Sequence, residues 1–298
     1  MKSYLRTAVV TAAISILALS GCNNSAKTIK TETFTFDDSA KYADVSIKAE
    51  LPVSRKGVDG AIRKGLIDIM DGQLAFIGSY EGERLFPAYD LNPDENAAVV
   101  DYYRRKAIDM LDSNAAEDYE ARASYVLEDQ DLTDEQKKDI LADTPRWEYD
   151  FTLEKQYETA RFVVFNSTDY VYLGGAHGGV IGLGSPTFDK KNGHRVEKFL
   201  RDDALAPMQS LLVAGLVEYF SDNDNTVNAG NVRDYLFLED ETVPFPGWTP
   251  HPTENGLCFV YQQYEIAAYA MGMPSFTIPY EAVKPYLTQE AADLLGLK

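Results

Sequence analysis

Histidine is the most versatile catalytic side chain in this chain of 298 residues, and one of its three histidines lies in a distinctive local pattern. His177 belongs to the glycine-rich segment Gly174-Gly175-Ala176-His177-Gly178, whereas His194 and His251 lie apart from it. An imidazole can ligate a metal or act as a general base, but either role needs a second ligand or a paired carboxylate. The sequence pairs His177 with neither. We therefore expect a structural or ligand-contacting histidine, and we predict no catalytic residue, no metal site and no cofactor.

Two further patterns are similar to ligand-binding loops but lack essential residues. The glycines of residues 179–184 are followed by Ser185-Pro186, not by the Lys and Ser/Thr of a phosphate-binding loop. Residues 222–225 resemble the start of a calcium-binding loop, but Val227 and Arg233 stand where such a loop has Gly and Glu. We interpret the glycines as residues of a tight turn or of close strand packing, and residues 222–225 as a solvated loop.

The N-terminus has the pattern of an export signal. Lys2 and Arg6 precede an apolar run from Ala8 to Leu19, which is 12 residues long. A membrane-spanning helix needs about 20 apolar residues, so we expect residues 1–21 to be a cleaved signal peptide. Leu19-Ser20-Gly21-Cys22 resembles the lipobox of bacterial lipoproteins, in which the thiol of the cysteine receives a lipid before cleavage. The alternative is ordinary secretion, with Cys22 as a chance thiol.

Lipidation of Cys22 has two consequences for the mature chain. We expect a lipoprotein of the cell envelope, on the periplasmic side or at the surface, anchored to a membrane by acyl chains, with residues 22–30 as a short tether. Cys258, the other cysteine, then has no partner for an intramolecular disulfide. It lies in an apolar run, so we predict a buried structural thiol, not a nucleophile.

The chain is strongly acidic. Its formal charge is −19, and loss of Lys2 and Arg6 with the signal peptide leaves 26 basic and 47 acidic residues, or −21. Such a surface repels nucleic acid and attracts basic partners or cations. Solubility in a crowded envelope explains the same excess, so the charge alone does not select a partner.

Apolar periodicity predicts secondary structure along most of the chain. In the first half, apolar residues at period two predict strands at residues 33–36 and 45–51. Period 3.6 or a capping pattern predicts helices at residues 58–70, 92–111 and 133–144. In the second half we expect strands at 147–153, 161–165, 170–173, 258–264 and 276–278, helices at 204–220 and from 288, and a turn at 191–193 leading into 195–200.

The predicted strands cluster, and helices are inserted between the clusters without regular alternation. This order favours the α+β class with antiparallel sheets and inserted helices. We predict two small domains, at residues 31–164 and 165–298.

Several blocks of the second half carry a family resemblance. These are residues 174–178, Phe188-Asp189, Asn192-Gly193, residues 259–272 and residues 276–280. In order and spacing they resemble an extracytoplasmic domain of unknown function shared by RsiV-type anti-sigma factors and PdaC-type peptidoglycan deacetylases. The likeness covers roughly residues 165–290, with Ala268 in place of an expected proline, and residues 43–70 are similar to the PdaC-type companion domain that often precedes it.

The resemblance implies sensing or binding, not catalysis by this domain. In the anti-sigma factors the corresponding region binds lysozyme, and in the deacetylases catalysis belongs to a separate appended domain. Thr35-Phe36-Asp37-Asp38 is similar to a metal-binding motif of that appended domain, but Ser39 follows where glycine is expected, and no two histidines lie four residues apart. A chance match within a strand is the better interpretation.

Two functional classes follow. The first is a non-catalytic envelope lipoprotein that binds a protein such as lysozyme, or a cell-wall glycan, through Gly174, Gly175, His177, Gly178 and Tyr264. The alternative is an envelope enzyme acting on peptidoglycan or another glycan through a site that no motif reveals. Converging titratable groups around His177 favour the enzyme, and exposed aromatic rings beside a groove favour glycan binding. We also expect Gly175→Val to damage folding more than His177→Ala reduces any metal content.

Overall fold

The computed structural model describes residues 28–77, 82–90, 95–143, 145–175, 179–222 and 224–297. The predicted signal peptide, Cys22, His177 and Gly178 lie outside the described residues. Within the described ranges the chain forms two sheets with helices packed against them, which confirms the α+β class. No helix in these ranges combines the length and the apolar composition that crossing a membrane requires.

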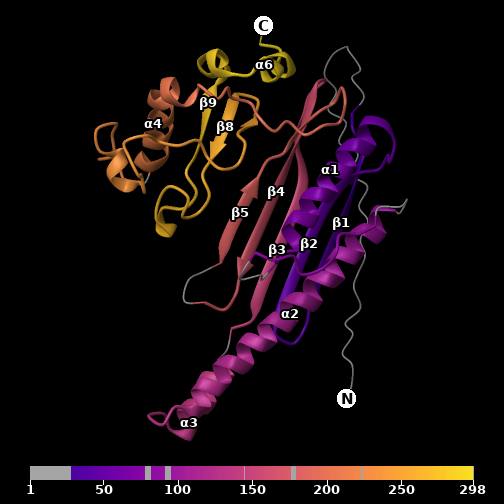
Figure 1. The fold of residues 1–298 in the computed structure, drawn as a ribbon, viewed down its shortest axis with the longest axis vertical. Helices are drawn as coiled ribbons and strands as arrows, with labels where there is room; N and C mark the ends of the chain where they lie inside the picture. The colour runs from indigo at the N-terminus through magenta and orange to yellow at the C-terminus, as the bar shows by residue number, and fades with distance from the viewer. Residues whose placement is uncertain are drawn as a thin grey trace.

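The larger sheet contains six strands. They are β1 (Thr31–Ser39), β2 (Ala43–Pro52), β3 (Trp147–Glu158), β4 (Phe162–Tyr172), β5 (Val180–Gly184) and β6 (Thr187–Asp189). The strands from β1 to β5 are neighbours in this order (Figure 1). Strand β6 pairs with the first residues of β4, next to the stretch of β4 that pairs with β5. All pairs are antiparallel except β2 with β3, which is parallel. A parallel pair needs a long connection, and the residues between β2 and β3 supply it as three helices.

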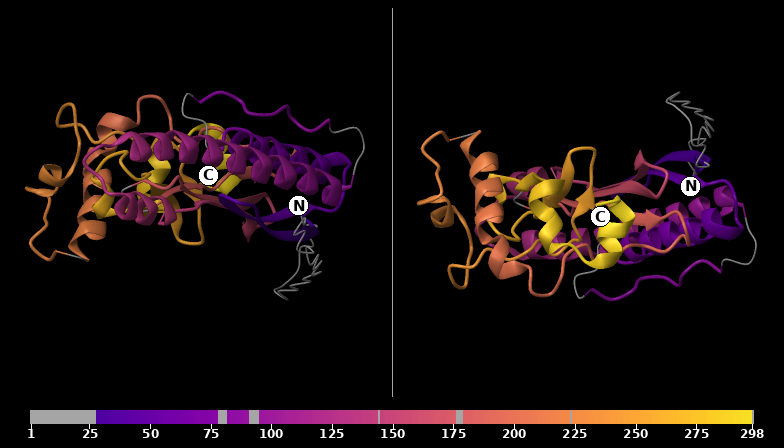
Figure 2. Two further views of the ribbon diagram at one scale, coloured as in Figure 1. Left: turned by 90° about the horizontal axis from the view of Figure 1, so that it is seen from below. Right: turned by 90° about the horizontal axis from the view of Figure 1, so that it is seen from above.

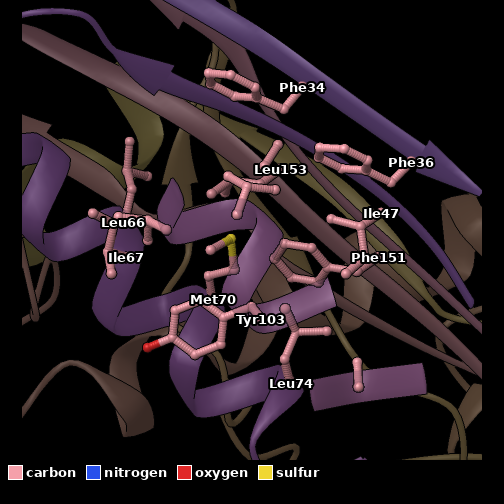
Figure 3. Packing of buried hydrophobic residues seen from close by; sticks show 14 of the residues in the cluster. Phe34, Phe36, Ile47, Leu66, Ile67, Met70, Leu74, Tyr103, Phe151 and Leu153 are labelled. Carbon is pink, nitrogen blue, oxygen red and sulfur yellow. The ribbon is translucent and has the colours of Figure 1, made fainter. Parts of the chain in front are cut away.

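Helices α1 (Gly57–Leu74) and α2 (Asn96–Glu128) cover one face of this sheet (Figures 1 and 2). The strands turn alternate side chains toward the helices, among them Ile47 and Phe151, while Leu66 and Met70 of α1 meet them from the other side (Figure 3). These four side chains are at most 1% exposed. The alternating apolar side chains of the strands and the apolar face of the helix therefore pack together in one core.

Helix α2 is longer than its apolar pattern predicts. Periodicity suggested an end near Leu111, but the helix continues to Glu128, although its last buried residue is Ala115. The additional residues contain neither Gly nor Pro and include good helix formers such as Ala, Glu and Arg, so propensity sustains the helix without a core. Helix α3 (Asp134–Ala142) follows, and its predicted capping box is confirmed: Thr133 and Gln136 satisfy each other's backbone N–H.

The smaller sheet contains β7 (His251–Pro252), β8 (Gly256–Val260) and β9 (Ser275–Pro279), all antiparallel. Helix α4 (Leu205–Ser221) packs on it, and the chain ends with α5 (Tyr280–Val283) and α6 (Gln289–Leu295). Three short 3₁₀ segments lie at Val232–Tyr235, Tyr269–Met271 and Lys284–Tyr286. This part lies beside the β5 side of the large sheet (Figures 1 and 2). Residues 195–200 form only isolated bridges.

Strand β4 contributes to both cores. Val163 and Phe165 belong to the core beneath α1 and α2, whereas Phe162 and Val164 belong to the core around α4 and the smaller sheet. Alternate residues of a strand point to opposite faces, so one strand can serve two cores. The predicted boundary between residues 164 and 165 falls within β4.

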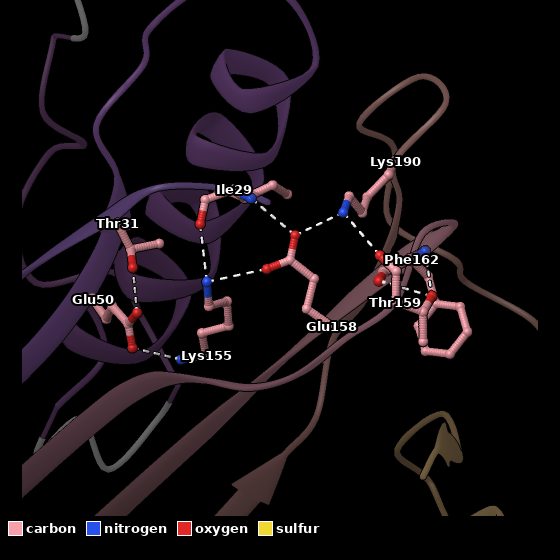
Figure 4. Close-up of polar contacts among 8 residues, drawn as sticks. All are labelled: Ile29, Thr31, Glu50, Lys155, Glu158, Thr159, Phe162 and Lys190. Atoms are coloured by element: carbon pink, nitrogen blue, oxygen red, sulfur yellow. Dashed lines mark hydrogen bonds and ion pairs between the residues drawn. The ribbon is translucent and has the colours of Figure 1, made fainter. Parts of the chain in front are cut away.

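A buried ionic network holds the first described residues to the end of β3 (Figure 4). One oxygen of the Glu158 carboxylate accepts hydrogen bonds from the Ile29 N–H at 2.9 Å and the Lys190 ammonium at 2.7 Å. Its other oxygen accepts from Lys155 at 3.1 Å, and Lys155 also donates to the Ile29 carbonyl at 2.9 Å. The Glu158 and Lys190 side chains are 12% and 9% exposed, so this pair is shielded from water.

Candidate functional site

The predicted glycine–histidine block is described only in part. Gly174 is buried and has a φ of +68°, a conformation that favours glycine, and its carbonyl lies 3.5 Å from a guanidinium nitrogen of Arg122. Gly175 is exposed, lacks a positive φ, and a Cβ added to it would meet no atom within 4 Å. The reason given for expecting Gly175→Val to damage folding does not hold, because the positive φ lies at Gly174 and not at Gly175.

The glycines that follow confirm the interpretation as close-packing residues. A Cβ at Gly179 would lie 2.1 Å from the ring of Tyr170, and one at Gly182 would lie 2.4 Å from the Asp169 carboxylate. A Cβ at Gly184 would approach the Trp248 indole at 3.1 Å. Glycine at position 184 thus lets an aromatic ring lie close to the backbone of β5.

Tyr264 has an unusual conformation for an aromatic residue. Its φ is +63°, and its side chain is 50% exposed. The ring lies 5.6 Å from that of Tyr269, whose hydroxyl donates to the Gly179 carbonyl at 2.8 Å. Tyr264 is thereby linked to the start of β5, whereas Gly174 contacts Pro145 and Trp147. Exposed residues in strained conformations are a feature of binding surfaces.

Two adjacent glutamines connect the second half of the chain to β5. The amide oxygen of Gln263 accepts from the Ile181 N–H at 2.8 Å, and that of Gln262 accepts from the Leu183 N–H at 2.8 Å. The Gln262 amide nitrogen donates to the Leu183 carbonyl at 2.9 Å. Both glutamines belong to the family-like block 259–272, but their partners lie 79 and 82 positions away, so no local pattern reveals their role.

Beside these glutamines lies a shallow groove, which we call the Trp248 groove. It consists of two adjoining hollows that share Ser185, Trp248 and Thr249. The first is also lined by Pro186, Thr187, Arg195, Val196, Phe199 and Pro250, and the second by Leu183, His251, Cys258 and Val260. Each hollow has room for about one water molecule. The groove is therefore a shallow depression of the surface, not an enclosed cavity.

The Trp248 loop is fixed by the segment that carries Tyr264. One oxygen of the Glu265 carboxylate accepts from the Gly247 N–H, and the other accepts from the Gln262 N–H at 2.6 Å. Phe237, 61% exposed, donates its backbone N–H to the Ile266 carbonyl at 2.7 Å. Three exposed aromatic residues, Phe237, Trp248 and Tyr264, are thus connected to one short segment.

The titratable groups of the groove are arranged poorly for catalysis. Burial lowers the pKa of His251 to about 4, so the imidazole is neutral at pH 7. Burial raises the pKa of the Cys258 thiol, which disfavours the nucleophilic thiolate. Within the described residues, no three His, Cys, Asp or Glu side chains gather as metal ligands would. His251 has no carboxylate partner there that would make it a general base.

Comparison with known families places a domain over part of this site. Residues 197–281 match the model of a family described as "Protein of unknown function (DUF3298)". These residues form a DUF3298 domain. It contains Trp248, His251 and Tyr264, while the β5 and β6 residues of the groove precede it. Among curated proteins, none matches the chain in sequence.

Solved DUF3298 family proteins share the fold far beyond the DUF3298 domain. A crystal structure from Bacteroides fragilis aligns with a TM-score of 0.64 and 16% identity, covering 92% of this chain and 99% of that one. A crystal structure from Pseudomonas aeruginosa aligns with a TM-score of 0.53 and 14% identity, covering 89% and 97%. The large sheet and the DUF3298 domain therefore occur together in this architecture.

Proposed function

We propose that this chain is a non-catalytic lipoprotein of the cell envelope, anchored through Cys22, which binds a cell-wall glycan along the Trp248 groove. The observation that carries the proposal is an exposed aromatic ring in a groove beside polar side chains. Trp248 is 36% exposed and lies against Gly184, with Ser185 and Thr249 next to it. A sugar ring presents an apolar C–H face and polar hydroxyls, and this combination complements both.

The shape of the groove also favours an extended ligand. Its lining follows the chain from Leu183 to Thr187, and β5 rises about 3.3 Å per residue, so this stretch spans about 13 Å. That length accommodates two to three sugar rings placed end to end. The hollows themselves are too small to enclose one ring, so the glycan lies across them and remains open to solvent.

The arrangement of the titratable groups supports binding without turnover. His251 is buried and neutral, and the Cys258 thiol is kept protonated, so the groove offers neither a paired acid and base nor an activated nucleophile. The alternative of an envelope enzyme requires a converging pair of such groups.

Lysozyme is the second candidate partner, and charge is the observation that favours it. A mature charge of −21 attracts a basic protein, and the RsiV-type resemblance implies a lysozyme-binding relative. Steering by charge fades with salt, because the Debye length is about 8 Å at physiological ionic strength. Lysozyme binding that persists there, and that an equally basic control protein does not share, would support this candidate.

Sedimentation with insoluble peptidoglycan tests the glycan proposal. We expect the full chain in detergent to co-sediment, and Trp248→Ala to weaken binding about tenfold because an aromatic contact of this kind contributes roughly 1 kcal/mol or more. Tyr125→Ala is the matched control, since Tyr125 is 78% exposed on the far end of α2. Equal binding by Trp248→Ala and wild type, with unchanged thermal melts, contradicts the proposal.

The lipid anchor has its own test. Cys22→Ser removes the thiol that accepts the lipid, so metabolic labelling with a palmitate analogue should mark the wild type and not the variant. Equal labelling of both chains would overturn the lipoprotein assignment.

A further inference from the structure

One end of the Trp248 groove contains polar atoms that the protein does not satisfy. The hydroxyl oxygen of Thr187 is buried and has no hydrogen-bond partner within the described chain, and the residue is only 2% exposed. The Nε atom of Arg195, which lines the same hollow, is likewise buried and without a hydrogen bond. Ser185 and Thr249 differ, because their hydroxyls donate to Asn166 and to the Glu197 carbonyl. A buried unsatisfied donor is costly, so these two atoms call for an acceptor.

Arg195 differs from other arginines of the chain in its carboxylate partner. Arg104, Arg146 and Arg201 each donate Nε to a carboxylate at 3.0 Å or less. The nearest carboxylate oxygen to Arg195 belongs to Glu197 and lies at 3.7 Å, beyond hydrogen-bond distance. The Glu197 side chain is 72% exposed, so solvent weakens even this interaction. In a chain with 47 acidic residues, the Nε atom of Arg195 thus has no carboxylate within hydrogen-bond distance.

The geometry selects a class of anion. A guanidinium presents a planar fork of N–H donors that matches the two oxygens of a carboxylate, and a hydroxyl beside it adds one further donor. Trp248 lines the same hollow and offers its ring to an apolar face next to that carboxylate. A sugar ring that carries a carboxylate substituent has both features in one residue.

We propose that the Thr187–Arg195 end of the groove binds the carboxylate of an acidic sugar, while Trp248 contacts its ring. This inference rests on the proposed glycan-binding function and adds the chemical class of the ligand. The acidic surface of the chain repels free anions, so the carboxylate is recognised only when the ring contact holds it in place. The site thereby distinguishes an acidic glycan from both a neutral glycan and a simple organic acid.

The two tryptophans provide a direct readout for a titration. Trp147 is 2% exposed in the core beneath α1 and α2, whereas Trp248 is 36% exposed in the groove, so a ligand-dependent change in emission reports Trp248. The probes are an N-acetylglucosamine oligomer, an oligomer of equal length whose alternate sugars carry a lactyl ether carboxylate, and free lactate. The full chain in detergent at physiological ionic strength is titrated with each.

We expect the carboxylated oligomer to bind about tenfold more tightly than the neutral one, and lactate to show no saturable binding. Arg195→Gln should abolish this preference, so that the two oligomers bind the variant with the same Kd. Arg195→Lys, which retains charge but loses the fork, should keep part of it, and Thr187→Val should reduce it severalfold. Arg201→Gln is the matched control, since Arg201 pairs with Asp203 and is not part of the groove lining.

Two failures can be told apart. Equal affinity of wild type for both oligomers, or a preference that survives Arg195→Gln, overturns the carboxylate subsite and leaves glycan binding in place. No binding of either oligomer overturns the proposed function and this inference with it.

Discussion

The part of the chain up to β6 and the part after it are built by different means. Strands β1 to β4 have nine to twelve residues and α2 has 33, whereas β7 to β9 have two to five. Backbone ladders and helices satisfy most polar groups of the first part. The second part has shorter strands, and side chains there bond to the backbone of distant segments.

Three such side chains define the path of the second part. Gln209 of α4 both donates to the Val243 carbonyl and accepts from its N–H, at 2.9 Å each. The Tyr261 hydroxyl donates to the Pro244 carbonyl at 2.8 Å, and the Tyr280 hydroxyl to that of Thr253 at 2.6 Å. Irregular backbone fixed in this way can present exposed aromatic residues without a regular element beneath each of them. The second part supplies Trp248 and Thr249 to the Trp248 groove, and the first part supplies Leu183 and Thr187. Under the proposed function, the regular first part supports the groove and the irregular second part carries its exposed ring.

The largest expected effect tests whether the two parts are one folding unit. Phe151→Ala in the first core and Phe259→Ala in the second should each reduce the free energy of unfolding by about 3–5 kcal/mol, because both rings are buried. Since β4 serves both cores, we expect each variant to shift one common transition. Urea unfolding followed separately by the fluorescence of Trp147 and of Trp248, in single-tryptophan variants, checks this. Two separated transitions would show that the parts fold independently.

The second largest expected effect is a pH-dependent loss of stability that arises from His251 in the second part of the chain. His251 has a pKa of about 4 in the fold, below its ordinary 6.5, because burial disfavours the charged form. The unfolded chain therefore binds more protons between these values, and stability is present above pH 6.5 and lost as pH falls toward 4. The loss approaches about 3 kcal/mol, at 1.36 kcal/mol per unit. Urea midpoints from pH 7 to pH 4 measure it. An identical pH slope in His251→Gln would refute this account.

The smallest effect distinguishes two neighbouring glycines of the regular part. Gly174→Ala should cost about 1 kcal/mol, because an L-residue at φ +68° is strained. Gly175→Ala should be neutral or slightly stabilising, since its Cβ meets nothing and alanine restricts the unfolded chain. Thermal melts of both variants give the comparison, and a larger loss at Gly175 would contradict it.

Local patterns predicted much of the regular part and little of the site. Alternation located β1, β2 and β3, and the Thr133 capping box located α3, because these signals depend on neighbouring residues. The parallel pairing of β2 with β3 was not foreseen, since it depends on which strands a long connection brings together. Of the predicted binding residues, Tyr264 lies in the segment that bonds to the Trp248 loop. Gly174 instead allows the positive φ of the backbone at its position.

The groove could not be predicted from the sequence for a related reason. Trp248 lies 53 positions after Arg195, and nothing in the local context of Thr187, Arg195 or Trp248 distinguishes them from ordinary surface residues. Their joint position depends on how the DUF3298 domain docks against β5. The unsatisfied atoms of Thr187 and Arg195 are apparent only in the folded chain.

The glutamine contacts with β5 restrict the ways in which the two regions can be assembled. Along a strand, the outward-facing N–H groups recur every second residue, about 7 Å apart, and those between them face the neighbouring strand. Gln263 and Gln262 meet two consecutive outward N–H groups, at Ile181 and Leu183. A slip of the second region by one residue would leave both amides without donors. Its position along the sheet edge is therefore allowed only in discrete steps, so the two walls of the groove keep a fixed alignment.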